Sequence, residues 1–274
     1  MCCCAYLRYS YIIKVTMFFK KKKETATPAI KMKTIICIPG IWKDRSDLVS
    51  SIFNNNANEF IFSGNVLLNM NTQQQFEIEV CDHDERMANS FKVAGMANRL
   101  DDSFLGEIEK HNTVIYLIGE GGSLEKAEAI AKAAQAIINA GGRGVKVETA
   151  GKAFTKEQWT SLIAGKPQSN LYKMFVLDSI TENETETVFS CGMHNLGLKD
   201  TIISGTTLEE SLDMISIFSY YQIVDKPVIR HGQTFSKAAD SPIYQILEEA
   251  SPPYSGMELF ENPYGMWRLQ RKIS

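Results

Sequence analysis

The chain has 274 residues, of which 44% are hydrophobic and 22% charged, so it can bury a sizeable core without disulfides. Its formal net charge of −3 lacks the basic excess that a general affinity for nucleic acid requires. The six cysteines show neither C-x-x-C spacing nor a Cys/His ladder, and we therefore expect no metal and no cofactor. Cys37, Cys81 and Cys191 stand alone in apolar surroundings, which predicts buried free thiols in a reducing compartment, the cytoplasm.

Residues 1–31 differ in composition from the rest and predict either a disordered leader or an over-long gene start. The basic cluster Lys20–Lys23 follows the apolar run, which is the wrong order for a secretory signal. In one interpretation, acylation of Cys2–Cys4 and contact of Lys20–Lys23 with anionic lipid tether the chain to a membrane. In the other, Met17 is the natural start. Without acylation we expect no membrane association.

The first half begins with the apolar run Lys33–Pro39, which a Pro-Gly pair closes and which predicts a buried central strand. Hydrophobic spacing predicts a helix over 44–53 and another over 86–100. Further strands are predicted at 61–70, 76–81 and 113–118, with a turn over 71–75.

The clearest helix is predicted over Ser123–Asn139, where small and branched apolar residues recur on one stripe. Ser123 can cap its first turn, and Gly141-Gly142 can end it. A short strand over 144–148 and a short helix over 156–163 follow.

The second half is predicted to contain strands over 172–177, 187–193 and 228–235, with an acidic turn over 182–186. A long helix over 207–224 is indicated by the stripe Leu208, Leu212, Ile215 and Phe218.

The order of these elements favours an α+β fold. Strands and helices do not alternate strictly enough for a doubly wound parallel sheet. We expect mixed, largely antiparallel sheets with helices packed on one face, in two related β-α-β-type halves. Residues 32–168 would form an N-terminal α/β half and residues 169–274 a C-terminal α+β half, with the seam near Gln168–Asn170.

Three stretches carry a resemblance to a family: the helix leading into 140–145 with 149–153 and Trp159, the stretch 191–200 (CGMHNLGLKD), and the ending 261–269 (ENPYGMWRL). From about residue 113 onward the chain resembles an uncharacterised bacterial family, a domain of unknown function, and the likeness extends over roughly 33–271. The resemblance implies a bacterial cytoplasmic protein and brings no activity with it.

His194 and His231 lie at opposite ends of one predicted strand–helix–strand unit, and Cys191 is close to the first of them. These three are the candidate catalytic residues, because a thiol and an imidazole can form a nucleophilic pair. Cys191 and His194 are three residues apart in a strand and start on opposite faces, and a pairing of Cys191 with His231 is feasible only if the two predicted strands are neighbours. The simpler interpretation is that both histidines cap turns or line a polar groove.

Two loops carry weaker signals. Gly119–Ser123 lies between a strand and a helix, where free N–H groups can hold phosphate, but it matches no nucleotide-binding motif and Glu120 would repel an anion. Asp82–Glu85 offers carboxylates and an imidazole, for which a helix cap is a simpler explanation than a metal.

No complete catalytic constellation emerges, so we expect a non-catalytic binding or interaction module, with another protein as a candidate partner. The alternative is a hydrolase with a groove lined by His194, Asn195, Asp200 and His231. The candidate ligand-binding residues are Asn195, Asp200, Arg230 and Glu120.

Overall fold

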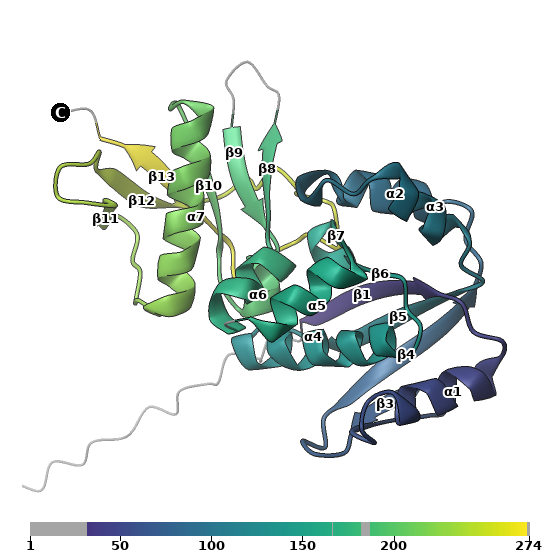
Figure 1. Ribbon diagram of the computed structural model, residues 1–274. Coiled ribbons are helices and arrows are strands. Elements are labelled where there is room, and N and C mark those ends of the chain that lie inside the picture. The colour runs from purple at the N-terminus through teal and green to yellow at the C-terminus, as the bar shows by residue number, and fades with distance from the viewer. Residues whose placement is uncertain (1–31, 166, 182–186, 273–274) are drawn as a thin grey trace, which may run out of the picture. The chain divides into compact units, whose positions relative to one another are not determined.

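The structure is a computed structural model, which describes residues 32–165, 167–181 and 187–272 (Figure 1). The described residues belong to one compact unit. The predictions for the leader 1–31 and for the turn 182–186 lie outside the described residues.

The first sheet, sheet A, has seven antiparallel strands in the order β2-β3-β4-β5-β1-β6-β7. The predicted central strand is confirmed as β1, which pairs with β5 along its full length. The strands are β1 (Lys33–Gly40), β2 (Phe60–Ser63), β3 (Val66–Asn69), β4 (Gln75–Asp82), β5 (Thr113–Glu120), β6 (Gly144–Val147) and β7 (Lys152–Thr155).

One face of sheet A holds the larger hydrophobic core. Its central helix is α4 (Leu124–Asn139), whose alanines and isoleucines pack against Ile36 and Leu117 of the sheet. Ser123 caps α4 as predicted, since its side chain accepts from the backbone N–H of Lys126. The helices α1 (Arg45–Asn54), α5 (Lys156–Ala164) and α6 (Pro167–Phe175) contribute to the same core.

The other face of sheet A carries a smaller cluster under α2 (Met87–Ala94) and α3 (Asp102–Glu109). Cys37 and Val114 point to this face, because side chains alternate along a strand and their neighbours Ile36 and Ile115 belong to the larger core. Figure 1 shows α2 and α4 on opposite sides of the sheet.

The second sheet, sheet B, has six strands in the order β11-β12-β13-β10-β9-β8, with only β10 and β13 parallel. Helix α7 (Leu208–Val224) covers one face through Met214, Ile215 and Phe218. The strands are β8 (Leu177–Thr181), β9 (Thr187–Cys191), β10 (Asp200–Ser204), β11 (Thr234–Phe235), β12 (Tyr244–Glu249) and β13 (Met266–Arg271).

The α+β class with largely antiparallel sheets is confirmed. Helices were expected on one face of each sheet. Sheet B has a helix on one face, whereas sheet A carries helices on both faces. Sheet A uses residues 33–155 and sheet B residues 177–271, and the expected seam at Gln168–Asn170 falls inside α6. Among the described residues, no helix has the length and apolar character needed to cross a membrane.

Several element predictions are wrong. Of the strand predicted over 172–177, residues 172–175 are the end of α6, whose buried residues are spaced for a helix face, and only Leu177 lies in a strand, as the first residue of β8. The run 61–70 is a hairpin, because Gly64 adopts φ +55° and turns the chain between β2 and β3. Of the strand predicted over 228–235, only Thr234–Phe235 pairs with a neighbour.

Candidate functional site

The conspicuous stretch Cys191–Gly197 forms a tightly packed turn inside the molecule. It contains the short 3₁₀ helix η3 (Met193–Leu196), all of which is buried. Gly192 and Gly197 have φ of +115° and +77°. A Cβ at Gly192 would lie 2.1 Å from the carbonyl oxygen of Phe175, and one at Gly197 would lie 2.3 Å from that of Gly122. Both glycines are therefore required by backbone conformation and by close packing.

Asn195 joins this turn to sheet A. Its Oδ1 accepts hydrogen bonds from Thr34 Oγ1 in β1 at 2.9 Å and from Thr149 Oγ1 at 2.8 Å. Its Nδ2 donates to the Gly192 carbonyl, and its own carbonyl accepts from the backbone N–H of Gly122. Asn195 is fully buried, so this candidate ligand-binding residue meets no solvent.

His194 lies beside it in the core and is also fully buried. Neither of its ring nitrogens finds a hydrogen-bond partner with normal geometry among the described residues. Burial lowers the pKa of His194 to about 4, and the Thr149 backbone opposes that shift only weakly. The ring is therefore neutral near pH 7, and no solvent-borne substrate can reach it as a general base.

Asp200 is a buried carboxyl at the start of β10 with no cation paired to it among the described residues. Its Oδ1 accepts from the backbone N–H of Met193 at 3.0 Å. Its Oδ2 accepts from the Tyr254 hydroxyl at 2.8 Å and from Asn262 Nδ2 at 2.7 Å. Burial raises the pKa of Asp200 to about 7, although these hydrogen bonds oppose the shift. Asp200 thus ties the loop that carries Tyr254 and Asn262 to sheet B.

Cys191, the candidate nucleophile, is nearly buried at 5% exposure. Burial, and next the charge of Asp200, raise the pKa of the Cys191 thiol far above its usual range. The thiol therefore stays protonated at neutral pH, and a protonated thiol is a poor nucleophile.

His231 lies apart from both residues. It is exposed, and its Nδ1 accepts from the backbone N–H of Glu248 in β12. The sheet order β12-β13-β10-β9 places β12 three strands from β9, which holds Cys191, or about 14 Å at roughly 4.8 Å per strand. The structure does not bring Cys191, His194 and His231 together.

The remaining two candidates lie elsewhere on the surface. Arg230 is exposed in the loop of His231, and its backbone N–H donates to Gln233 Oε1. Glu120 ends β5 and pairs with Lys126 at 2.8 Å.

The glycine loop after Glu120 has little capacity for phosphate. The N–H of Gly121 donates to the carbonyl of Met32, and that of Gly122 to the carbonyl of Asn195. These backbone donors are already used, which supports the simpler interpretation of the loop as a tight turn.

The Asp82–Glu85 loop is held by two histidines. The rings of His83 and His111 stack at 4.4 Å, and His111 Nε2 accepts from the backbone N–H of Asp84 at 3.1 Å. The helix cap expected in this loop is not found: the N-cap residue of α2 is Arg86, and no side chain caps it. The Asp84 carboxylate instead accepts from the backbone N–H of Arg86 itself. Within the described part of the chain, no group of three or more His, Cys, Asp or Glu residues is placed to hold a metal ion.

The sequence did not predict a cleft that lies between α2 and the sheets, in two adjoining chambers. The apolar chamber has a volume of about 750 Å³ and the polar chamber about 530 Å³. Arg86, Ser90 and Lys146 line both, and we call them the junction residues. The other residues of the polar chamber are Ile35, Glu79, Asp84, Met87, Tyr116, Ile118, Glu148 and Leu259.

The floor of the apolar chamber is the face of sheet B formed by β8 and β9. Its side chains come from two directly paired positions, Leu177 opposite Cys191 and Ser179 opposite Phe189. The loop after β12 adds Pro253, Tyr254, Met257 and Phe260, and α2 and η2 (Glu148–Ala150) contribute Asn89, Val93, Ala94, Ala150 and the following Gly151. Asp200 of β10 accepts a hydrogen bond from Tyr254, so it helps to position the loop after β12 that lines the apolar chamber.

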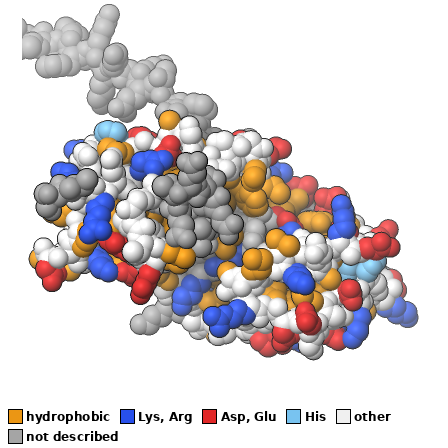
Figure 2. All heavy atoms as spheres, turned by 90° about the horizontal axis from the view of Figure 1, so that it is seen from above, with side chains coloured by type: hydrophobic (Ala, Val, Ile, Leu, Met, Phe, Trp, Pro, Cys, Tyr) orange, Lys and Arg blue, Asp and Glu red, His pale blue; other side chains and the backbone are white. Residues whose placement is uncertain are grey.

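Apolar side chains also reach the surface beside the cleft. Val93 is 62% exposed and Met257 is 55% exposed. Figure 2 shows the face seen from above, with hydrophobic side chains surfacing among acidic and basic ones.

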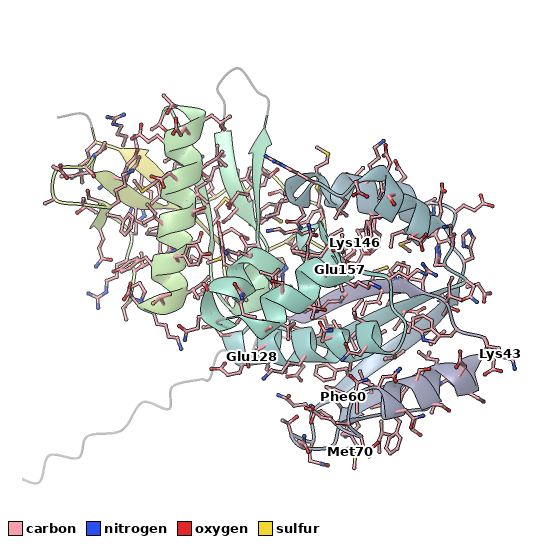
Figure 3. All side chains as sticks on the ribbon, viewed as in Figure 1. Lys43, Phe60, Met70, Glu128, Lys146 and Glu157 are labelled. Carbon is pink, nitrogen blue, oxygen red and sulfur yellow. The ribbon has the colours of Figure 1, made fainter. Side chains whose placement is uncertain are left out.

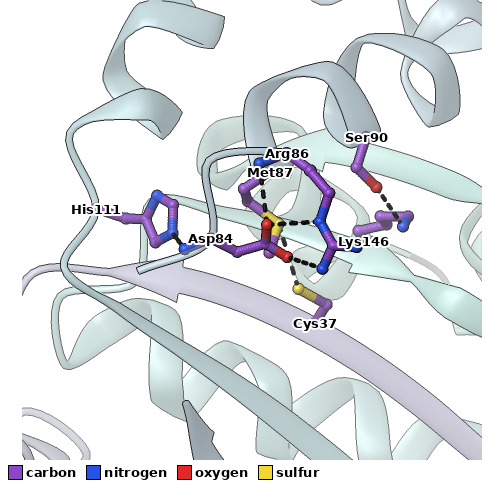
Figure 4. Close-up of polar contacts among 7 residues, drawn as sticks. All are labelled: Cys37, Asp84, Arg86, Met87, Ser90, His111 and Lys146. Carbon is purple, nitrogen blue, oxygen red and sulfur yellow. Dashed lines mark hydrogen bonds and ion pairs between the residues drawn. The ribbon is translucent and has the colours of Figure 1, made fainter. Parts of the chain in front are cut away.

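The junction residues are held by ion pairs and hydrogen bonds (Figure 4). Lys146 Nζ lies 2.6 Å from Ser90 Oγ and 2.8 Å from Glu148 Oε2, and the Lys146 and Glu148 side chains are only 15% and 16% exposed. Arg86 donates Nε and Nη2 to Asp84, which lowers the pKa of that carboxyl to about 2. Figure 3 shows Lys146 between β6 and α2.

The polar chamber follows a row of side chains across sheet A. The strand register aligns Glu79 of β4, Tyr116 of β5, Cys37 of β1 and Lys146 of β6. Burial raises the pKa of both Cys37 and Tyr116 well above the usual range, so both are neutral at pH 7. Lys146 and Glu79 therefore bring the charge to this row.

One signal in the sequence could have pointed to the junction. In the predicted strand 144–148, Val145 and Val147 alternate with Lys146, which places the lysine on the opposite face from the core. The pattern cannot show that α2, more than 50 residues earlier, returns over that face and supplies Ser90.

Comparisons with protein-family models, with curated proteins and with solved structures gave no match. The family resemblance of 33–271 therefore stays a prediction.

Proposed function

We propose that this protein is a non-catalytic binding module whose ligand occupies the apolar chamber. The observation that carries the proposal is the chamber itself, about 750 Å³ between sheet B and α2. Small-molecule sites typically measure about 300–1,000 Å³ and are lined by apolar side chains with a few placed polar groups. Here Phe189, Tyr254 and Phe260 supply the apolar lining, and the junction residues are the polar groups.

The state of the titratable candidates supports a non-catalytic role. His194 and Asp200 are fully buried, Cys191 is a protonated thiol, and His231 is exposed on another part of sheet B. A nucleophile, a base and an orienting group within hydrogen-bond reach of one another are what covalent catalysis needs.

Binding can be measured with N-phenyl-1-naphthylamine, a neutral probe whose fluorescence increases in apolar surroundings. We expect saturable binding to the full chain and its loss in Ser179→Phe, because the larger side chain fills the chamber from β8. The matched control is Ser50→Phe on the exposed side of α1, which should bind like the wild type. A fully folded Ser179→Phe variant that binds the probe unchanged would refute this site.

The hydrolase with a groove at His194, Asn195, Asp200 and His231 has less support, because three of the four residues have no exposed surface. Its test is a screen of ester and amide substrates. Turnover that disappears in His194→Ala would establish the hydrolase and end the proposal of a non-catalytic module.

A protein partner and a bacterial cytoplasmic location belong to the same proposal. Exposed Val93, Met257 and Leu259, which line the two chambers, support a partner at the cleft. The buried free thiols Cys37 and Cys191 support a reducing compartment. A pull-down on wild type and on Val93→Asp, with retention of a stoichiometric partner by the wild type alone, is the expected result.

A further inference from the structure

We infer that the ligand of the apolar chamber is an amphipathic organic anion whose carboxylate or similar head group lies beside Lys146. This inference rests on the proposed binding function and names the chemical class of its ligand. It starts from how charge is distributed over the two chambers.

The two chambers differ in the charges that line them. Arg86 and Lys146 are the only charged side chains among the described residues that line the apolar chamber. Both cations also line the polar chamber, where their carboxylate partners Asp84 and Glu148 lie together with Glu79. The lining of the apolar chamber thus includes two cationic side chains and no carboxylate among the described residues, which favours an anion there and disfavours a cation.

Both cations retain donors for a ligand. An ammonium has three donors, and Lys146 uses two of them on Ser90 and Glu148. Arg86 uses Nε and Nη2 on Asp84, which leaves Nη1. A carboxylate offers only acceptors and carries the opposite charge, so it can complete the coordination of both side chains, whereas an alcohol oxygen can accept from them but adds no opposite charge.

Burial ranks the two contacts. The Lys146 side chain is 15% exposed and the Arg86 side chain is 87% exposed. Solvent screens an exposed charge, so a head group gains more from Lys146 at the back of the chamber than from Arg86 at its rim. We assign the head-group contact mainly to Lys146.

The test compares three ligands that share one chain and differ in head group: octanoate, 1-octanol and octyltrimethylammonium. Each is titrated against the probe bound to the full chain. We expect octanoate to displace the probe at concentrations about tenfold or more below 1-octanol, the scale of one charge-assisted hydrogen bond. Octyltrimethylammonium should be the weakest of the three.

Lys146→Met keeps the length of the side chain and removes its charge. It should abolish the preference for octanoate over 1-octanol and leave 1-octanol unchanged. The single variant leaves the Glu148 carboxylate without its cation, so the double variant Lys146→Met/Glu148→Gln is measured beside it. The double variant should also lose the preference for octanoate, and it carries the test if the single variant folds poorly. Lys92→Met, on the exposed side of α2, is the matched control and should keep the preference.

The outcomes separate the two proposals. If neither the probe nor any octyl compound binds, the proposed function fails. If the probe binds but 1-octanol or octyltrimethylammonium competes as well as octanoate, the chamber binds ligands and the inference of an anion is overturned. Preference for octanoate that survives both Lys146 variants also overturns it.

Discussion

Two groups of polar side chains in this protein differ in how completely they are satisfied. Asn195 and Asp200 lie in the interior with no exposed surface and with hydrogen bonds to several elements each. Lys146 and Arg86 lie at the edge of a cavity and keep donors without a partner among the described residues. The first arrangement fixes a fold, and the second leaves capacity for a ligand. The conspicuous sequence stretch belongs to the first.

The largest expected effect is the difference in stability loss between a variant of the buried group and a variant of the junction residues. Asp200→Ala leaves the Met193 N–H and the Tyr254 hydroxyl without their acceptor, and it leaves Asn262 Nδ2 with one of its two acceptors, the Leu198 carbonyl. At about 1–3 kcal/mol for each unsatisfied buried group, we expect a loss of roughly 4 kcal/mol in the free energy of unfolding. Ser90→Ala at the junction should cost about 1 kcal/mol. Urea denaturation measures both, and equal losses would contradict the comparison.

A pH titration of stability tests Asp200 without removing it. Its pKa is raised to about 7 in the folded protein from an ordinary value of 3.8, so its contribution is fully present below the unfolded pKa and is lost as pH rises through 7. Between about pH 5 and pH 8 this group should lower the free energy of unfolding by on the order of 3 kcal/mol. Asp200→Asn should remove that slope, and an unchanged slope would show that Asp200 is not its source.

His194 should give the free energy of unfolding a pH dependence of the opposite sign and of smaller size than that of Asp200. Its pKa is lowered to about 4 in the folded protein from an ordinary value of 6.5, so its contribution to stability is fully present above pH 6.5 and is lost as pH falls through 4. Between about pH 6.5 and pH 5 the loss should be about 2 kcal/mol. It is measured most clearly in Asp200→Asn, where the opposing slope is gone. His194→Phe in that background should abolish it.

Much of the fold could be predicted from the sequence, because hydrophobic period and capping are local. The run of β1, the cap Ser123 and the stripe of α7 all follow from spacing alone. The strand β10 was missed since it is short and follows a turn whose glycines are set by contacts with Phe175 and Gly122.

The site was less accessible to sequence reasoning. Three of the residues that stood out as candidates, His194, Asn195 and Asp200, are interior groups, and the fourth, Cys191, lines the floor of the apolar chamber as a nearly buried thiol. A Gly- and His-rich stretch looks the same in the sequence whether it packs a core or lines a groove. The junction depends on α2 crossing sheet A and on the loop after β12 closing the chamber. Such long-range placement has no local signature.

The smallest expected effect concerns the rim of the cleft. Arg86→Gln removes an ion pair whose arginine is 87% exposed and screened by solvent, so the free energy of unfolding should change little. Octanoate binding should weaken by only about twofold to threefold, less than for Lys146→Met. Calorimetric titration gives the affinity, and a larger loss for Arg86→Gln than for Lys146→Met would reverse the ranking of the two cations.

The most direct measurement is a titration of the isotopically labelled chain with octanoate, followed by the amide resonances of each residue. We predict shifts at Ser90, Lys146, Ser179 and Phe189 around the cleft, and unchanged resonances at His231 and Glu120. Shifts confined to the surroundings of His231 or Glu120, or no shifts at saturating octanoate, would contradict the assignment of the cleft as the binding site.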